Sequence, residues 1–552
     1  MSEGISFLNH SKKITEHFLQ SVVAVDDNME FRSRQLEISE DLVEPDEDDH
    51  FGSIEPKDDR EKAPLKHKLY YQDLSLEFAK RGIVCGGFSP TDDTHTSLDA
   101  IVNTSKNADI TILDWQMQIA GEDGKLAVDT IKKIAELDIK DGGRTRLICI
   151  YTAENADDVA QVLASSVEDL TPSKEKLTIS FNKTGLSHWK IEIVNKDKQE
   201  VDLCEYLINS FTNLTAGLLS NAALSAIAAI RDNTHHLLHK FNKELDPAYL
   251  SHVLGLISSP DMREQANDVA FDYAVDLISE ELKSNLQVSR LVKNSLSSDK
   301  LCSWPEFINK KNDKNCFRLK IGSEEIKFFD NSVMRNLINA PTVEELGKVL
   351  EHEIGLSEVD NKPPLERFKR SPIQLTTFKN ENSPLLELCA IESVRRDIRS
   401  IREEHIPVLK QGTIIKKQGE NKYYFCIQPV CDSVRLTGYS TFSLMQISKT
   451  SSGFTHVIRA TSNHLKLKIQ PAPKLIRTYT FFACDEHKVV RATKQGELYL
   501  FTDISAGEEN KIVFEWCGEL KQSVSQAVIN NLASQIARVG LDSFEWLRQK
   551  QN

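Results

Sequence analysis

Four short apolar segments in the first third of the chain, each followed by a polar residue, constrain the fold most strongly. The segments are Val22–Val25, Ile110–Leu113, Leu147–Tyr151 and Leu177–Phe181. Apolar runs of four or five residues that alternate with helical patterns are typical of strands in a parallel sheet that is buried on both faces. Ligands bind such sheets at the carboxyl ends of the strands. The residues that follow the four segments are therefore candidate site residues.

Those residues carry carboxylate, hydroxyl and ammonium groups. Asp26 and Asp27 follow the first segment, Asp114 the second, Thr152 the third, and Lys183 lies two residues after the fourth. One polar group at each of four strand ends predicts a single site at one edge of the sheet.

The segments between these strands carry helical periodicity. Residues 70–81, 97–104, 126–137 and 156–165 read as helices, and 83–88 reads as a second strand. Strands that alternate with short helices predict a doubly wound parallel sheet of the flavodoxin type.

A chain of 552 residues exceeds what one hydrophobic core accommodates, so several domains are expected. We expect four parts: residues 1–195 with an acidic insert at about 30–69, a helical domain at 196–300, a mixed α/β and linker region at 301–404, and a β-rich domain at 405–552 that ends in a helix. The β-rich part is expected to form a small barrel or sandwich. The insert reads as a long loop, either without chemistry of its own or as a segment that docks a partner or gates the site.

Composition narrows the class of protein. Hydrophobic residues make up 40% of the chain and charged residues 27%, and no stretch reaches the roughly 20 apolar residues of a membrane span. The first residues lack the basic and then apolar order of a secretory signal. The ten cysteines form no C-x-x-C pair, so reduced core thiols are expected rather than disulfides or zinc ligands. These features predict a cytoplasmic protein without a membrane anchor.

The net charge of −14 is unevenly distributed. Residues 405–552 hold 19 Lys and Arg against 12 Asp and Glu, a balance of +7, which leaves −21 for residues 1–404. Such asymmetry indicates either a basic face for nucleic acid or two parts of one molecule that attract each other.

The five polar residues suit phosphoryl transfer. Mg²⁺ is held in proteins by one or two carboxylates, water and phosphate oxygens, which Asp26 and Asp27 would supply. Asp114 would then be the nucleophile that forms an acyl phosphate. Lys183 would pair with Asp114 before the reaction and with a phosphoryl oxygen afterwards. The Thr152 hydroxyl would donate to the same phosphoryl group.

This pattern resembles the receiver domain of two-component response regulators over roughly residues 15–195. The motifs are Val25-Asp26-Asp27, Leu113-Asp114-Trp115-Gln116-Met117, Tyr151-Thr152-Ala153 and Asn182-Lys183-Thr184. The resemblance implies a histidine kinase as phosphodonor, Mg²⁺ as cofactor, and the backbone carbonyl of Gln116 as a further metal ligand. The usual proline after the lysine is replaced by Thr184, so no cis peptide bond is implied there.

Other readings of the chain stay open. A haloacid-dehalogenase-like phosphatase would need a D-x-D motif, which Asp114-Trp115-Gln116 does not supply. The receiver could be inert within an interaction scaffold. The basic C-terminal region, with Tyr423-Tyr424-Phe425 near Arg435, Lys466 and Lys468, could bind DNA, although no helix-turn-helix pattern is recognisable. Core packing with period-2 alternation explains the same aromatic residues.

No separate output enzyme is recognisable, so any activity is expected to be limited to self-phosphorylation and autodephosphorylation. In architecture the chain is similar to large receiver proteins of bacterial anti-phage systems of the Detocs type. In those systems a receiver protein can act as a sink for phosphoryl groups and so damp false activation. That similarity implies a histidine kinase and a further protein as partners.

Overall fold

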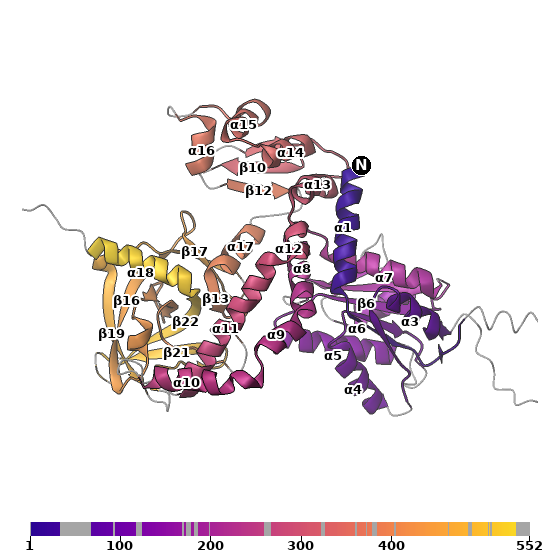
Figure 1. The fold of residues 1–552 in the computed structure, drawn as a ribbon, viewed down its shortest axis with the longest axis horizontal. Coiled ribbons are helices and arrows are strands. Elements are labelled where there is room, and N and C mark those ends of the chain that lie inside the picture. Colours follow the sequence, from indigo (N-terminus) through magenta and orange to yellow (C-terminus); the bar gives the residue numbers. More distant parts are fainter. Residues whose placement is uncertain are drawn as a thin grey trace, which may run out of the picture. The chain divides into compact units, whose positions relative to one another are not determined.

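The structure is a computed structural model (Figure 1). It describes residues 2–33, 68–91, 94–117, 124–167, 170–172, 178–181, 186–197, 199–258, 266–321, 326–358, 362–370, 373–377, 383–401, 405–461, 463–483, 488–505, 507 and 511–536. Most of the expected acidic insert therefore lies outside the described residues. The chain divides into two compact units, one with the N-terminal sheet and one with the C-terminal sheet.

The N-terminal sheet is doubly wound, as predicted. Its parallel strands are β1 (Ser21–Val25), β4 (Val84–Phe88), β5 (Ile110–Asp114), β6 (Arg146–Thr152) and β9 (Trp189–Asn195). They lie in the order β4-β1-β5-β6-β9, which in chain order is 2-1-3-4-5, the flavodoxin-like arrangement. A short parallel pair, β2 (Met29–Glu30) with β3 (Leu69–Tyr70), adjoins it in the chain.

The fourth apolar segment is not a parallel strand, which corrects the sequence-based expectation. It forms β8 (Thr178–Phe181), which runs antiparallel to both β7 (Leu170–Pro172) and β9. This hairpin extends the described sheet to β4-β1-β5-β6-β9-β8-β7. The parallel strand beside β6 is instead β9, one segment further along the chain.

Helices cover both faces of this sheet. On one face α3 (Tyr71–Ala79) and α7 (Glu200–Thr215) share a core with Val22, Ile112 and Cys149. On the other face α4 (Thr94–Ser105), α5 (Lys125–Lys140) and α6 (Ala156–Ser166) pack on Val23, Leu113 and the alternate residues of β6. Because a buried parallel strand presents side chains to two helix layers, its sequence is apolar throughout. The hydrophobic core of the N-terminal sheet includes side chains of α7, which lies beyond residue 195, the end of the first part expected from the sequence.

An N-terminal helix, α1 (Ser2–Phe18), packs on α7, α8 (Leu218–Asp232) and α13 (Ser298–Ile308). The ring centroids of Phe7 and Phe307 are 4.9 Å apart. The side-chain amide of Asn221 donates a hydrogen bond to Ser11 Oγ at 2.9 Å. The helical middle predicted from the sequence is thus confirmed, with α1 joined to it.

The remaining elements up to residue 377 are mainly helical. They are α9 (Thr234–Lys240), η3 (Lys243–Leu245), α10 (Asp246–Ile257), α11 (Ala266–Val288), α12 (Arg290–Ser295), β10 (Phe317–Ile321), β11 (Ile326–Phe329), α14 (Asn331–Asn339), α15 (Val343–Lys348), η4 (Val349–Glu353), α16 (Pro364–Arg370) and β12 (Ile373–Thr377). No single described helix is long and apolar enough to cross a membrane, and α7 with α8, which pass that test only as a pair, are bent by 119°.

The C-terminal unit contains a closed antiparallel sheet. Its described elements are α17 (Ser383–Ser393), β13 (Val394–Asp397), β14 (Thr413–Lys417), β15 (Tyr423–Cys426), η5 (Val430–Ser433), β16 (Gly438–Lys449), β17 (His456–Arg459), β18 (His464–Lys468), η6 (Pro473–Leu475), β19 (Ile476–Ala483), β20 (Thr493–Gln495), β21 (Leu498–Asp503), β22 (Ile512–Leu520) and α18 (Gln522–Ile536). Strands β14, β15, β16, β19, β21 and β22 pair in a ring, since β21 also pairs with β22. The predicted small barrel is confirmed.

Period-2 alternation divides the barrel's side chains between two cores. Tyr424 joins the core with Phe481, Phe514 and Trp516, and its neighbours Tyr423 and Phe425 join a second core. Helix α18 and the β17–β18 hairpin contribute to the second core.

Helix α17 ends at Ser393. The next residues form β13, because they pair with β22 at the edge of the barrel.

Candidate functional site

Three aspartates meet at the carboxyl edge of the N-terminal sheet. Asp26 and Asp27 directly follow β1, and Asp114 is the last residue of β5, the neighbouring strand. One carboxylate oxygen from each lies within 4.8 Å of the others. Asp26 and Asp114 are 1% and 3% exposed, whereas Asp27 is half-buried. Parallel neighbours that end at the same edge bring these residues together, as the sequence predicted.

A lysine joins the aspartates, but it is Lys196. Its ammonium group lies 2.7 Å from Asp26 Oδ2 and 3.1 Å from Asp114 Oδ1, and its side chain is buried. Lys196 directly follows β9, and its backbone N–H donates to the Thr152 carbonyl at 2.8 Å. Lys183, the lysine expected from the sequence, lies outside the described residues.

The sequence contains a signal that favours Lys196, although it does not by itself decide between the two lysines. An Asn-Lys pair lies at the end of both β8 and β9, so the local motif does not separate Lys183 from Lys196. In a doubly wound sheet, however, parallel strands usually alternate with helices that pack on the faces of the sheet. The helical pattern at Glu200–Thr215 comes after Trp189–Asn195, which favours that segment as the parallel strand.

Backbone amides orient the two buried carboxylates. The N–H of Asn28 donates to Asp26 Oδ1 at 2.7 Å, and the N–H of Trp115 donates to Asp114 Oδ1 at 2.8 Å. The side-chain amide of Asn28 also donates to Asp27 Oδ1 at 3.0 Å. These hydrogen bonds fix the orientation of the three carboxylates, which lie close together without a bound ligand.

Burial determines the titration of the buried aspartates. It raises the pKa of Asp114 to about 7, and the nearby charge of Asp26 adds to this shift while Lys196 opposes it. The pKa of Asp26 is also raised, mainly because its carboxylate loses contact with water. The close approach of acidic groups in a buried site disfavours their joint ionisation. A cation that neutralises them would remove that penalty.

Thr152 ends β6 and is buried beside this cluster. Its hydroxyl oxygen accepts from the N–H of Glu154 at 3.0 Å, so its own O–H can still donate. The side chain of Gln116 donates to the carboxylate of Glu154, which connects the loops that follow β5 and β6. The backbone carbonyl of Gln116 accepts no hydrogen bond from the residues that the structure describes.

The loop after Asp114 requires a glycine at its far end. Gly124 has a φ of +78° and donates its N–H to the carbonyl of Trp115 at 3.0 Å. A Cβ atom at Gly124 would lie 2.2 Å from the indole ring of Trp115. The glycine therefore permits Trp115, which is 4% exposed, to pack in the core and to hold the residue before it.

The donor set suits a hard divalent cation. The three carboxylates and the backbone carbonyl of Gln116 are all oxygen ligands, which Mg²⁺ prefers over nitrogen or sulfur. Three carboxylates with one ammonium group also leave a formal charge of −2 when all are ionised, which one divalent ion balances.

Comparison with protein families matches this region to one model. The model describes the response receiver domain and covers residues 18–201. This part of the chain is a receiver domain. A receiver domain accepts a phosphoryl group in two-component signalling, and the general kind of donor is a histidine kinase. Searches of curated proteins and of solved structures find no match to the chain.

Proposed function

We propose that the chain accepts a phosphoryl group on Asp114 from a partner histidine kinase, with Mg²⁺ bound by Asp26, Asp27, Asp114 and the backbone carbonyl of Gln116. The observation that carries the proposal is the contact of the Lys196 ammonium with both Asp26 and Asp114. Ion pairs of this kind also occur as purely structural features. Here, though, the pair lies at the strand ends of a receiver domain, beside a third carboxylate and a buried threonine.

Asp114 Oδ2 is the atom we assign as nucleophile. Oδ1 accepts from Trp115 and contacts Lys196, whereas Oδ2 accepts no hydrogen bond from a described residue. In the transfer, a new O–P bond forms at Oδ2 while the P–N bond of the donor phosphohistidine breaks, and the imidazole leaves with the electron pair of that bond. Bound Mg²⁺ would neutralise charge on the phosphoryl oxygens.

Lys196 and Thr152 would recognise the phosphoryl group. The ammonium group of Lys196 would move from the Asp114 carboxylate to a phosphoryl oxygen, which stays within the reach of a lysine side chain. The O–H of Thr152 would donate to another phosphoryl oxygen. Because Glu154 bonds to both Thr152 and Gln116, this step would be transmitted to the loop after β6.

The proposal includes a cellular role. A cytoplasmic receiver with no recognisable output enzyme fits a regulator or a phosphoryl sink in bacterial anti-phage defence, acting with a kinase and a further protein partner. This part rests on architecture alone. Co-expression with the histidine kinase encoded nearest to the gene, followed by a transfer assay, would test it.

Intact-mass analysis tests the acceptor itself. The full chain is treated with acetyl phosphate in the presence or absence of Mg²⁺. We expect one phosphoryl adduct that requires Mg²⁺ and disappears in Asp114→Ala. Asp99→Ala is the matched control, because Asp99 is an exposed aspartate of α4 that pairs with Lys133. Labelling that persists in Asp114→Ala would overturn the assignment, and absence of labelling with every donor would favour an inert scaffold.

Burial of the three aromatic residues in β15 counts against the DNA-binding alternative. Tyr423, Tyr424 and Phe425 are 5%, 3% and 0% exposed, so their rings offer no face on which bases stack. The +7 balance of residues 405–552 remains as its basis. Salt-dependent binding of DNA by the full chain would revive this alternative.

A further inference from the structure

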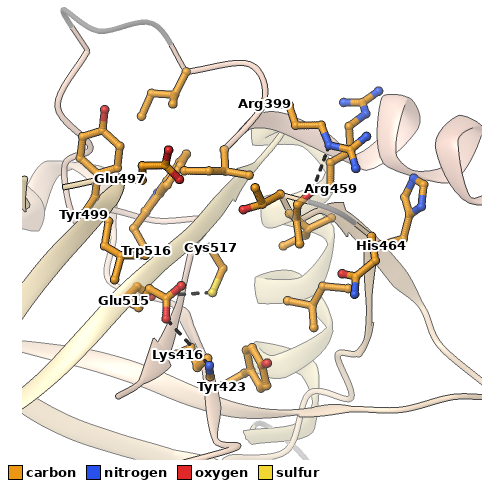
Figure 2. A pocket seen from close by; sticks show the side chains of 18 of the residues that line it. Arg399, Lys416, Tyr423, Arg459, His464, Glu497, Tyr499, Glu515, Trp516 and Cys517 are labelled. Carbon is orange, nitrogen blue, oxygen red and sulfur yellow. Dashed lines mark hydrogen bonds and ion pairs between the residues drawn. The ribbon is translucent and has the colours of Figure 1, made fainter. Parts of the chain in front are cut away.

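A cavity of about 640 Å³ is lined by residues of the C-terminal barrel and its connecting segments (Figure 2). Most of its lining comes from the segment after β13, the β17–β18 hairpin, the β20–β21 hairpin and strand β22, and β14, β15 and β16 add one residue each. Its volume is in the range of roughly 300–1,000 Å³ that is usual for small-molecule sites. The receiver chemistry does not involve this cavity, so it requires a separate account.

Two residues that line the cavity, Arg459 and His464, are fixed by ion pairs with Glu387 and Asp397, which do not line it. Arg459 donates from Nε to Glu387 and from Nη1 to Asp397 Oδ2 at 3.0 Å. His464 Nε2 lies 2.8 Å from the other oxygen of Glu387. Asp397 is 0% exposed, and Glu387 belongs to α17. These carboxylates balance the charge of Arg459, so this wall contributes fixed N–H groups more than net charge.

Three further cations lining the cavity have no acidic partner among the described residues. Arg399 uses Nε to donate to the carbonyl of Ala460 at 2.9 Å, which orients its guanidinium while its terminal nitrogens make no hydrogen bond in the described structure. Lys449 and Lys494 line the same cavity and form no ion pair with a described residue. Lys494 lies 5.9 Å from the ring centroid of Tyr499. Their uncompensated charge favours an anionic ligand.

The carboxylates of the cavity do not balance these cations. Glu515 is paired with Lys416 at 3.8 Å, which leaves only Glu497 among the acidic lining residues. Among the residues that the structure describes, three cations without an acidic partner and one carboxylate without a cationic partner therefore line the cavity. A ligand with about two negative charges would neutralise the site.

The two ends of the cavity carry different charged groups. Figure 2 shows Arg399 and Arg459 together at one end and Glu497 with Tyr499 at the other, with Trp516 and Cys517 between them. A ligand that spans the cavity would thus meet the Arg399 guanidinium at one end, and the Glu497 carboxylate with the Lys494 ammonium near Tyr499 at the other.

We propose that this cavity binds a nucleoside phosphate. Its phosphate would lie at the Arg399 end, its base would lie along the apolar middle, and its hydroxyl or amino groups would donate to Glu497. Arginine is well suited to phosphate because its planar guanidinium offers two parallel donors. Inorganic phosphate alone would fill only a small part of the cavity.

Titration of the full chain with ATP, AMP, adenosine, inorganic phosphate and a single-stranded oligonucleotide tests the proposal by calorimetry. Saturable binding of ATP or AMP, with adenosine and phosphate each much weaker, supports it. No saturable binding of either nucleotide up to about 1 mM overturns it, since this corresponds to only about 4 kcal/mol of binding free energy. Binding of the oligonucleotide without binding of the mononucleotides also overturns it and assigns the charge to nucleic acid.

Variants locate the bound nucleotide. Arg399→Gln should weaken binding about tenfold or more, because it removes a charge-assisted hydrogen bond. Lys494→Gln, at an exposed position, is the second variant in case loss of the Arg399–Ala460 bond disturbs folding. Lys468→Gln is the matched control, since Lys468 is an exposed lysine of β18 outside the cavity. Equal affinity of all three variants and the unmodified chain would place binding elsewhere and overturn the proposal.

Discussion

The ammonium group of Lys196 lies 2.7 Å from Asp26 Oδ2, although 170 residues separate the two in the chain. Both side chains are buried, and the same ammonium group lies 3.1 Å from Asp114 Oδ1. Lys196 therefore balances part of the negative charge that the aspartates bring to the site. Removing one partner of a buried ion pair leaves an uncompensated charge, which makes this contact a sensitive point of the receiver domain.

The first prediction concerns the choice between the two lysines. Lys196→Met should lower Mg²⁺-dependent labelling by acetyl phosphate by about 10²-fold or more, because it removes a preorganised cation at the reacting group. Lys183→Met is the comparison, since Lys183 follows a strand with the opposite direction. Intact-mass time courses measure both. Loss of labelling in Lys183→Met with normal labelling in Lys196→Met would reverse the assignment.

The second prediction concerns pH and metal. Because burial raises the pKa of Asp114 to about 7, the stability associated with its protonated form is present below the ordinary pKa of about 4 and is lost as the pH rises through about 7. Mg²⁺ should therefore raise the melting temperature of the metal-free protein more at about pH 8 than at about pH 5.5. Thermal unfolding with chelator and with added Mg²⁺ measures this.

Asp114→Asn provides the control for that experiment. It removes the titrating carboxyl, so most of the difference between the two pH values should disappear. An equal Mg²⁺ effect at both pH values in the unmodified protein would contradict the prediction.

The third prediction concerns a buried ion pair at the opposite end of the sheet. Arg146 donates from Nε and Nη2 to Asp138 at 2.8 and 2.9 Å, and Trp189 Nε1 donates to the same carboxylate at 3.0 Å. Arg146→Met leaves that carboxylate buried without its cation, at a cost of about 3–5 kcal/mol. We expect the receiver's melting temperature to fall by roughly 6–20 °C.

An exposed pair of the same domain provides the comparison. Lys133→Met breaks the contact between Lys133 and Asp99, which is largely solvent-exposed and should cost about 0–1 kcal/mol. Differential scanning calorimetry of the full chain measures both variants. Similar melting temperatures for Arg146→Met and Lys133→Met would refute the expected difference.

The fourth prediction concerns the free edge of the receiver sheet. The hydroxyl of Tyr71 donates to the carbonyl of Cys85 at 2.7 Å, and the Tyr71 ring packs against Gly87. These are groups of edge strand β4, and a Cβ at Gly87 would come within 2.6 Å of the Tyr71 ring. Tyr71→Phe should cost about 1 kcal/mol and speed hydrogen exchange at Gly87. Unchanged exchange at Gly87 in Tyr71→Phe would show that the hydroxyl does not protect this edge.

Much of the receiver follows from local sequence. The apolar runs before Asp26, Asp114 and Thr152 occur as β1, β5 and β6, because runs of that composition are stable only when buried between two helix layers. Once these strands are parallel and adjacent, their ends must meet, so the cluster of Asp26, Asp27 and Asp114 was predictable. The alternation of Tyr423 and Tyr424 between two cores was equally readable from the barrel strands.

The identity of the lysine in the site, Lys196, could not be predicted from local sequence in the same way. Phe181-Asn182-Lys183 and Val194-Asn195-Lys196 have similar local patterns, and no local propensity reports whether a strand runs parallel or antiparallel to its neighbour. The direction of β9 is a property of its pairing with β6 and of the helix α7 that returns across the sheet. The cavity of the C-terminal barrel likewise joins Arg399, Glu497 and Trp516 from separate segments.

The amino-acid sequence by itself determined the strand ends, the acidic cluster and the class of the domain, because burial and periodicity act over a few residues at a time. Only the tertiary structure decided which lysine contacts Asp26 and which cations share a cavity. Those contacts depend on the direction and order of strands, which long-range hydrogen bonding sets and local sequence does not record.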